Sequence, residues 1–426
     1  MKTLIGRALL GQSGGPTSVI NASAAGVFIE ALEHSDYITG VLAGHHGIKG
    51  ILEEDFYDIR KEDRAQLQLL LTTPSSAIGS VRYKLADVKV NDTDYIKLLN
   101  VFKKYNIRYF FYNGGNDSMD TCNKISKFIN SNGFECRCIG IPKTIDNDLA
   151  LTDHCPGYGS AAKYIATTLM ELYLDATVYN TKQVTIVEIM GRNAGWLAAA
   201  AALASYKGLG PDLLYLPEKP FDENLFFEQC LEKVNTKGKC IVCISEGIKN
   251  KEGKYIPELF SDLSKDAFGH VQLGGAASVL ASELTKRAKV KVRAIELSLL
   301  QRCAAHLASK TDVNEAFMVG CEAVKAAISG KTDLMVSIDR KFSNTYSVNY
   351  SLVPLEEVAN KEKTVPLSWI KEDNTGMTDD FINYALPLIQ GEMDYPVEDG
   401  LPVFAKLKKI KFTLPKFEYC EDCEEE

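Results

Sequence analysis

The sequence has no excess of positive charge and no apolar run long enough to span a membrane. Its formal net charge is −8, from 48 lysines and arginines against 56 aspartates and glutamates. This balance disfavours nucleic acid and anionic membranes as partners, because both select basic faces. The longest apolar run, residues 196–204, covers about half a membrane span. Gly6 and Arg7 interrupt the apolar stretch at the N-terminus, so we expect no signal peptide and predict a soluble, cytoplasmic protein.

The sequence also lacks a four-ligand zinc pattern, although it contains 11 cysteines. Cys240 and Cys243 have the spacing Cys-x-x-Cys, but they lie in an apolar run that predicts a buried strand. Cys420 and Cys423 have the same spacing in an acidic tail without other ligands near in sequence. Structural zinc usually takes four ligands. We therefore interpret the cysteines as reduced thiols in a reducing compartment.

Two nucleotide-binding fingerprints are missing as well. No Gly-x-x-x-x-Gly-Lys-Ser/Thr segment occurs, which excludes a Walker-type phosphate loop. Residues 157–162 (Gly-Tyr-Gly-Ser-Ala-Ala) fit Gly-x-Gly-x-x-Ala, but no clear hydrophobic strand precedes them. A Rossmann oxidoreductase is therefore the weakest functional interpretation.

Short β-rich runs alternate with amphipathic stretches along most of the chain. Strands are predicted at 8–10, 37–42, 108–112, 137–141, 185–188, 213–216, 239–245 and 290–297, and helices at 20–33, 93–105, 118–132 and 159–174. This alternation predicts an α/β fold with two doubly wound, Rossmann-like domains and parallel-rich sheets. We place the domains at 1–150 and 151–345, and expect 346–426 to pack across them and to end in a solvated acidic tail. Such sheets bind ligands at the carboxyl ends of their strands.

The loop 11–17 follows the first predicted strand and precedes a predicted helix. Its glycines, including Gly14 and Gly15, would let backbone N–H groups approach a phosphate, with the helix N-terminus adding a positive dipole end. A tight turn without a ligand explains this loop equally well. Arg82, in the polar turn 79–84, could donate two hydrogen bonds at once from its guanidinium group to phosphate oxygens.

A second glycine-rich loop runs from Gly114 and Gly115 through Asn116 and Asp117 to Ser118. Capping of the following helix by the aspartate or the serine would explain its polar residues. Capping does not need the glycine pair, however, so we favour a loop that faces a ligand.

The segment 142–148 (Pro-Lys-Thr-Ile-Asp-Asn-Asp) follows another predicted strand. Asp146 and Asp148 beside Lys143 suit phosphoryl transfer. One carboxylate can accept a proton from an attacking hydroxyl, while the other orients that hydroxyl or helps to hold Mg²⁺. An Asx turn is the structural alternative.

These segments resemble the motifs of phosphofructokinases, in the same order, over roughly residues 5–335. The motifs are 11–15, Gly-Gly-Asn-Asp-Ser at 114–118, Pro-Lys-Thr-Ile-Asp-Asn-Asp at 142–148, Met-Gly-Arg at 190–192, Pro-Glu at 217–218 and Leu-Gln-Arg at 300–302. The resemblance implies the phosphofructokinase fold and transfer of a phosphoryl group to the 1-hydroxyl of fructose 6-phosphate. It also implies Mg²⁺ and a homodimer or homotetramer.

The same resemblance assigns roles to individual residues. Asp146 is implied as the general base, supported by Thr144 and Asp148. The implied donor contacts are Gly14, Gly15, Arg82, Gly115, Asp117, Ser118 and Lys143. The implied acceptor contacts are Thr144, Asp146, Met190, Gly191, Arg192, Glu218, and the pair Arg293 and Arg302, which would clamp the 6-phosphate. The segment 269–275 lacks the clamp arginine and is interpreted as a glycine-rich loop near the sugar.

Two positions indicate the phosphoryl donor. Asp117 and Lys143 are the residues typical of pyrophosphate users in this family, where the best-known ATP users have glycine. Like charges about 4 Å apart repel by about 4 kcal/mol at an effective dielectric constant of about 20, so a carboxylate at 117 opposes the α-phosphate of ATP. We predict pyrophosphate as donor. An ATP-dependent 6-phosphofructokinase is the first alternative.

The other alternative is a non-catalytic regulatory subunit of the same fold, which the presence of both Asp146 and Asp148 disfavours. Asn116 stands where the family often has an aspartate linked to Mg²⁺. An amide oxygen can ligate the ion but adds no charge, so the metal candidates are Asn116 and Asp146.

Overall fold

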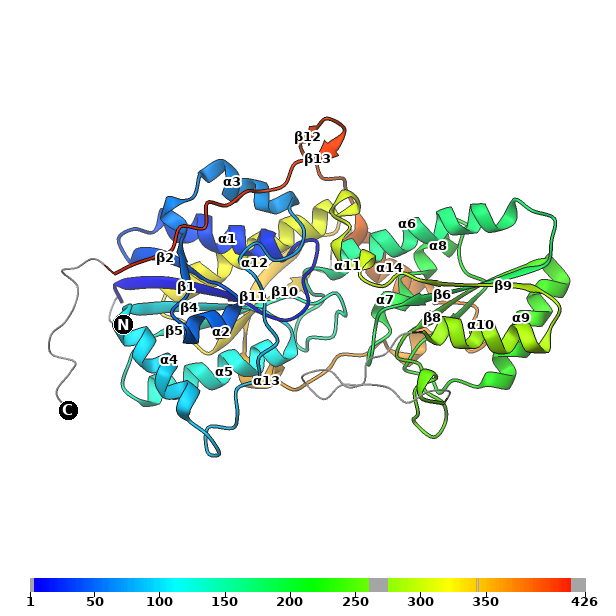
Figure 1. Ribbon diagram of the computed structural model, residues 1–426, viewed down its shortest axis with the longest axis horizontal. Coiled ribbons are helices and arrows are strands. Elements are labelled where there is room, and N and C mark those ends of the chain that lie inside the picture. The colour runs from blue at the N-terminus through cyan, green and yellow to red at the C-terminus, as the bar shows by residue number, and fades with distance from the viewer. Residues whose placement is uncertain (1–3, 260–274, 342, 344, 415–426) are drawn as a thin grey trace.

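The structure is a computed structural model that describes residues 4–259, 275–341, 343 and 345–414. Two α/β lobes lie side by side along its long axis (Figure 1). The acidic tail and all but the last residue of the glycine-rich segment 269–275 lie outside the described residues. Within the described residues, no helix is both long and apolar enough to cross a membrane.

The N-terminal lobe is built on a seven-stranded sheet with the order β11-β10-β5-β4-β1-β2-β3. The strands are β1 (Gly6–Gln12), β2 (Ile38–Gly44), β3 (Phe56–Asp58), β4 (Ile107–Gly114), β5 (Arg137–Pro142), β10 (Leu334–Arg340) and β11 (Val348–Pro354). The inner strands pair in parallel, whereas β3 and β11 are antiparallel edges. The chain therefore brings the carboxyl ends of β1, β4 and β5 to one edge of the sheet.

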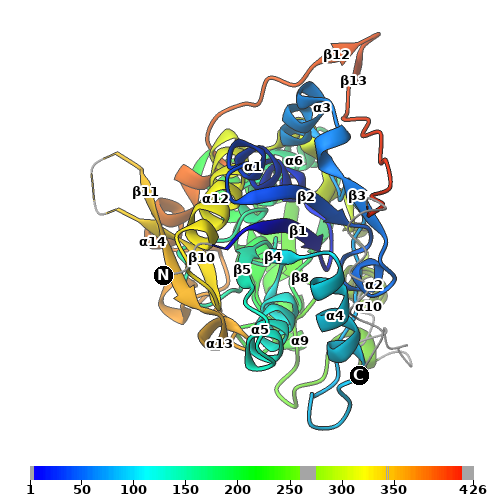
Figure 2. The same cartoon turned by 90° about the vertical axis from the view of Figure 1, so that its left-hand side faces the viewer.

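Helices cover both faces of this sheet. Figure 2 shows α1 (Ile20–Glu33) and α12 (Lys310–Ile328) on one side, and α4 (Thr93–Lys104) and α5 (Asn116–Ser131) on the other. Glycines allow α1 and α12 to touch backbone to backbone. A Cβ at Gly26 would lie 2.1 Å from the carbonyl oxygen of Phe317, and one at Gly320 would lie 2.2 Å from that of Ser23. Any side chain at either glycine would force the helices apart.

The second lobe has a parallel four-stranded sheet with the order β7-β8-β6-β9. Its strands are β6 (Gln183–Ile189), β7 (Leu213–Tyr215), β8 (Lys239–Ser245) and β9 (Lys291–Glu296). The helix α6 (Tyr158–Thr177) lies on one side of the sheet, and α9 (Glu223–Lys237) and α10 (Ala276–Arg287) lie on the other (Figure 1). The two apolar cores of this lobe pack on these two faces.

Shorter elements complete the fold. The short helices are α2 (Gly47–Leu52), α3 (Arg64–Leu69), α7 (Trp196–Ala199), α8 (Ala202–Tyr206), α11 (Leu300–Cys303), α13 (Leu355–Val358) and α14 (Asp379–Ala385), and a hairpin joins β12 (Val397–Glu398) to β13 (Leu401–Pro402). Single 3-10 turns occur at Ile59–Lys61, Leu70–Thr72, Pro257–Leu259, Ala305–Leu307, Leu367–Trp369 and Leu386–Ile389.

The predicted α/β fold is confirmed, but the lobes do not follow the predicted boundaries. The chain returns to the N-terminal lobe with α12, and β10 then extends the first sheet beside β5. A second domain at 151–345 is therefore wrong at its C-terminal end. The predicted strands end at 290–297, so β10 (Leu334–Arg340) was not predicted, and hydrophobic periodicity alone does not say which sheet a strand joins. After β11 the chain runs along the second lobe, where Leu214 donates to the carbonyl oxygen of Asn374, and ends on the first, where Phe412 donates to that of Phe56.

Candidate active site

A cavity of about 600 Å³ lies where the carboxyl ends of the two sheets face each other. Its walls come from the loops after β1, β4 and β5 in the first lobe and after β6 and β8 in the second. The remaining wall comes from residues 82 and 83 in the first lobe and from residues 360 and 362 of the C-terminal extension. The cavity thus collects side chains from five strand ends, as expected for ligand sites of parallel sheets.

The loop after β1 is held in place by side chains of two other loops. Gly14 has a left-handed φ of +79°, which glycine adopts without strain. The carbonyl oxygen of Gly14 accepts a hydrogen bond from Ser80 Oγ at 2.7 Å, and that of Gly15 accepts one from Lys143 Nζ at 2.8 Å. Arg82 lines the cavity next to this loop.

The loop after β4 leads directly into α5. Gly114 packs so closely on the helix that a Cβ would lie 2.1 Å from Ser118 Oγ. Gly115 is the N-cap of α5, and Asp117 and Ser118 line the cavity from its first turn. The N-terminus of a 16-residue helix attracts phosphate through its free N–H groups. The carboxylate of Asp117 repels any additional negatively charged group that binds beside it.

Side-chain hydrogen bonds hold the acidic loop after β5. The hydroxyl oxygen of Thr144 accepts a hydrogen bond from the backbone N–H of Asp146 at 3.0 Å. Asn147 is buried with a left-handed φ of +55°. Its Nδ2 donates to the Tyr384 hydroxyl at 2.7 Å, and its Oδ1 accepts from the N–H of Cys155 at 2.9 Å. The side chains of Asp146 and Asp148 are thereby held at the cavity wall.

Burial changes the acidity of all three charged groups of this loop. Burial, together with the charge of Glu246, raises the pKa of Asp146 to about 6. Burial and the neighbouring Asp146 raise the pKa of Asp148 to about 7. Burial lowers the pKa of Lys143 to about 8. The loop therefore holds a base and a cation whose charges both change near neutral pH.

The two carboxylates are the best candidates for a metal. Oδ1 of Asp148 is buried and has no hydrogen-bond partner among the described residues. No cluster of three or more His, Cys, Asp or Glu suited to a metal occurs in the part of the chain that the structure describes. Mg²⁺ does not need such a cluster, because it keeps several waters and binds through one or two carboxylates plus substrate phosphates. Asp146 and Asp148 therefore fit Mg²⁺.

The other predicted metal candidate is engaged elsewhere. Nδ2 of Asn116 donates to the carbonyl oxygen of Lys361 at 2.6 Å, and its Oδ1 accepts from the backbone N–H of Asn360. The amide thus joins α5 to the C-terminal extension. Its geometry matches a backbone segment rather than an ion.

The opposite wall is formed by the loop after β6. Met190 and Arg192 line the cavity. Gly191 has a φ of +135°, and a Cβ there would lie 2.7 Å from the carbonyl oxygen of Ala194. The N–H of Gly191 donates to Glu246 Oε1 at 3.3 Å. The predicted motif 190–192 therefore faces the acidic loop across the cavity.

The predicted phosphate clamp is not brought together within one chain. A Cβ at Gly15 would lie 2.6 Å from Nη1 of Arg302, and burial with the nearby Arg82 lowers the Arg302 pKa. Arg302 therefore stands beside the cavity. Arg293 lies on the edge strand β9, pairs with Asp175 at 3.4 Å and is not part of the cavity lining.

Glu218 lies one layer behind the cavity wall. Its Oε1 accepts hydrogen bonds from the backbone N–H groups of Gly195 and Val365 at 2.8 and 2.9 Å. Its buried Oε2 has no hydrogen-bond partner among the described residues, and burial raises its pKa. A contact between Glu218 and a sugar hydroxyl remains a prediction.

Two parts of the site were not predicted. Glu246 follows β8 directly, so the rule about carboxyl strand ends, applied to the predicted strand 239–245, would have found it. Asn360 and Glu362 belong to an irregular segment. Only its contacts with distant residues bring it to the cavity, and no local sequence signal marks it.

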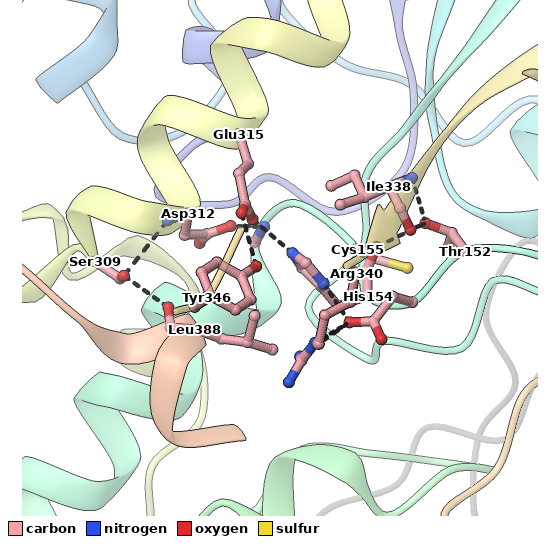
Figure 3. A network of polar contacts seen from close by, with 12 residues as sticks. Thr152, His154, Cys155, Ser309, Asp312, Glu315, Ile338, Arg340, Tyr346 and Leu388 are labelled. Atoms are coloured by element: carbon pink, nitrogen blue, oxygen red, sulfur yellow. Dashed lines mark hydrogen bonds and ion pairs between the residues drawn. The ribbon is translucent and has the colours of Figure 1, made fainter. Parts of the chain in front are cut away.

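A buried polar network surrounds residues 152–155, in the segment between the acidic loop and α6 (Figure 3). His154 contacts Asp153 Oδ1 through Nδ1 at 2.8 Å and Glu315 Oε2 through Nε2 at 2.6 Å. Tyr346 donates to the other oxygen of Glu315 at 2.7 Å, and Arg340 donates to Asp153 at 2.9 Å. Burial disfavours the charged imidazole, but the two carboxylates outweigh it and raise the pKa of His154 to about 9. The contacts of His154 thus join the segment that follows the acidic loop to α12.

Comparisons with known proteins agree with this geometry. The phosphofructokinase family model matches residues 7–327. A pyrophosphate–fructose 6-phosphate 1-phosphotransferase of Halomonas elongata is 44% identical over 96% of this chain and 98% of its own length. One of Xanthomonas campestris is 43% identical over 97% and 99%. The crystal structure of a pyrophosphate-dependent phosphofructokinase from Marinobacter aquaeolei covers 96% of this chain and 98% of its own, with 40% identity and a TM-score of 0.87. The chain belongs to the phosphofructokinase family.

Proposed function

We propose that this protein transfers a phosphoryl group from pyrophosphate to the 1-hydroxyl of fructose 6-phosphate, giving fructose 1,6-bisphosphate and phosphate. The observation that carries the donor assignment is Asp117 in the first turn of α5, at the cavity wall. With a carboxylate at this position, the helix N-terminus can still bind the two phosphates of pyrophosphate. The carboxylate repels the third phosphate that ATP would bring. The relatives named above have pyrophosphate in their names. In the reverse direction, inorganic phosphate would accept the phosphoryl group from fructose 1,6-bisphosphate and re-form pyrophosphate, so the proposed reaction is reversible.

Asp146 is the general base of the proposed mechanism. With its pKa raised to about 6, it is ionised at neutral pH and still basic enough to take the proton of the 1-hydroxyl. The hydroxyl oxygen forms a bond to the terminal phosphorus of pyrophosphate, and the bond from that phosphorus to the bridging oxygen breaks. The electron pair of the broken bond leaves with inorganic phosphate.

Lys143 faces the leaving group. Its ammonium group is fixed on Gly15 and is buried near Asp146. A fixed cation in a buried site stabilises the charge that develops on the departing phosphate. Arg82 and the N-terminus of α5 supply the remaining positive potential on the donor side.

Asp146 and Asp148 would hold Mg²⁺ together with the oxygens of pyrophosphate, since Asp148 Oδ1 lacks another partner among the described residues. When bound, Mg²⁺ supplies charge that neutralises the transferring phosphoryl group. On the acceptor side, Met190 and Arg192 lie where they could contact fructose 6-phosphate. Arg302 would pair with its 6-phosphate.

An ATP-dependent reaction is the second candidate, because Lys143 alone does not exclude it. A coupled assay with fructose 6-phosphate and Mg²⁺ separates the two, with pyrophosphate and ATP offered in separate reactions. We expect turnover with pyrophosphate. Turnover with ATP alone would overturn the donor assignment, and no turnover with either would favour the non-catalytic alternative.

We also propose a homodimer or homotetramer in the cytoplasm. The end of α6 leaves Leu174, Val178 and Tyr179 exposed by 54%, 71% and 60%. They lie by the unpaired edge of β9, whose Arg293 contacts Asp175 of α6. An apolar patch beside an edge strand suits a second copy. Sedimentation of the purified protein tests this assembly. The nine cysteines of the described residues are all free, which suits a reducing compartment.

A further inference from the structure

Residues 360–363, which we call the interlobe strap, pass along the cavity from one lobe to the other. On the first lobe, Asn116 holds the strap by two hydrogen bonds to its backbone, with Asn360 and Lys361. On the second lobe, Asn193 Nδ2 donates to Glu362 Oε1 at 2.8 Å. The strap is therefore anchored on both sides of the site.

Lys363, the last residue of the strap, holds the strap in place through four hydrogen bonds. The backbone N–H of Lys363 donates to the carbonyl oxygen of Asp148 at 2.7 Å, and its own carbonyl oxygen accepts from Trp196 Nε1 at 2.9 Å. Its Nζ donates to the carbonyl oxygens of Thr152 and Asp153 at 3.0 and 2.7 Å. Moving the strap would break all four hydrogen bonds.

The first residue of the strap covers the outer face of α5. Asn116 and Asp120 are four residues apart and so share one face of that helix. Asn360 lies over this face, with Nδ2 3.3 Å from Asp120 Oδ1, and it also lines the cavity. Asn360 thus occupies the space beside the first turn of α5, directly outside the proposed phosphate site.

A nucleoside triphosphate is longer than pyrophosphate by one phosphate and a nucleoside. With its terminal phosphates at the N-terminus of α5, the remainder must leave past the first turn of that helix. We propose that Asn360, held in place by Asn116, is a second determinant of donor choice. Asn360 excludes a nucleotide by filling the space past the first turn of α5, whereas Asp117 excludes it by electrostatic repulsion. This inference rests on the proposed function.

The strap also gives a reason for an amide at position 116. The two strap contacts need one acceptor, for the N–H of Asn360, and one donor, for the carbonyl oxygen of Lys361. Asparagine offers both, whereas an ionised aspartate only accepts. A purely metal-binding role would not require the donor.

A double-mutant cycle tests the inference. Asp117→Gly removes the charge, and Asn360→Gly removes the side chain at a φ of +60° that glycine adopts without strain. The measured quantity is the ratio of kcat/KM with ATP to kcat/KM with pyrophosphate, at saturating fructose 6-phosphate, with ADP release as the ATP readout. Asn374→Gly is the matched control, because Asn374 has a φ of +58° and is not part of the cavity lining.

In the Asp117→Gly background, we expect Asn360→Gly to raise this ratio by about tenfold and Asn374→Gly to leave it unchanged. Asn116→Ala in the same background should also raise the ratio, because it removes the two hydrogen bonds that hold Asn360 and Lys361 against α5. Equal ratios with and without Asn360→Gly, or an equal rise with Asn374→Gly, would overturn the inference. An unmodified protein that fails to use pyrophosphate would instead overturn the proposed function.

Discussion

Lys143 Nζ donates to the carbonyl oxygen of Gly15 at 2.8 Å, which joins the acidic loop after β5 to the glycine-rich loop after β1. The contact places a buried cation between these two loops. Lys143 thereby fixes the distance between the glycine-rich loop and Asp146, the proposed general base.

Lys143→Met should lower kcat with pyrophosphate by about a hundredfold, the usual effect of removing one group that stabilises developing charge. The KM for fructose 6-phosphate should change little. Because burial lowers the Lys143 pKa to about 8, the unmodified enzyme should lose activity as the pH rises through that value. The variant should lack this alkaline limb. If Lys143→Met still loses activity as the pH rises through about 8, another group is responsible for that loss.

Asp146→Asn should abolish most of the turnover, because the amide cannot take the proton of the 1-hydroxyl. In the unmodified enzyme, activity should fall as the pH drops through about 7 to 6, where the coupled pair Asp148 and Asp146 takes up protons. The pH profile of kcat/KM measures this limb. A rate that stays constant down to pH of about 5 would contradict the role of the pair.

Asp117→Gly should raise kcat/KM with ATP, because it removes the carboxylate that opposes a third phosphate. The repulsion of about 4 kcal/mol between two like charges about 4 Å apart is an upper bound for this change, so a gain of about tenfold is expected while Asn360 stays in place. Asp380→Gly is a suitable comparison, because it removes an exposed carboxylate from the first turn of α14, which does not line the cavity. Parallel assays with the two donors measure the effect. Unchanged ATP use in Asp117→Gly would favour the ATP-dependent alternative.

Much of the site could be predicted because its chemistry sits in short segments after strands. The apolar run 239–245 predicts a strand and is β8 over the same residues, and the acidic loop follows β5 as expected. In these segments the apolar pattern fixes the strand, and the polar residues after it can only lie at the sheet edge.

Other parts depend on tertiary contacts that a local pattern does not contain. Arg293 and Arg302 are close in sequence, but the chain leaves β9 and turns into α11 between them, so only Arg302 stands beside the cavity. β10 has the pattern of a strand, yet its place beside β5 follows from the packing of α12 on α1. Nearness in sequence therefore does not show whether two side chains, such as those of Arg293 and Arg302, reach the same site.

His154→Ala should destabilise the fold by about 3 kcal/mol or more, because it leaves Glu315 and Asp153 without the cation between them. His306→Ala is the control, since His306 is exposed and should change the unfolding free energy by less than about 0.5 kcal/mol. Urea unfolding of the three proteins gives both values.

The pH dependence of this difference distinguishes an imidazolium from a neutral histidine. The folded pKa of His154 is raised to about 9, above the value of about 6.5 for an unfolded chain. Its contribution to stability should therefore be complete below about pH 6.5 and decline as the pH rises toward 9. If the stability gap between the unmodified protein and His154→Ala stays constant from about pH 6 to 9, His154 is neutral in the fold.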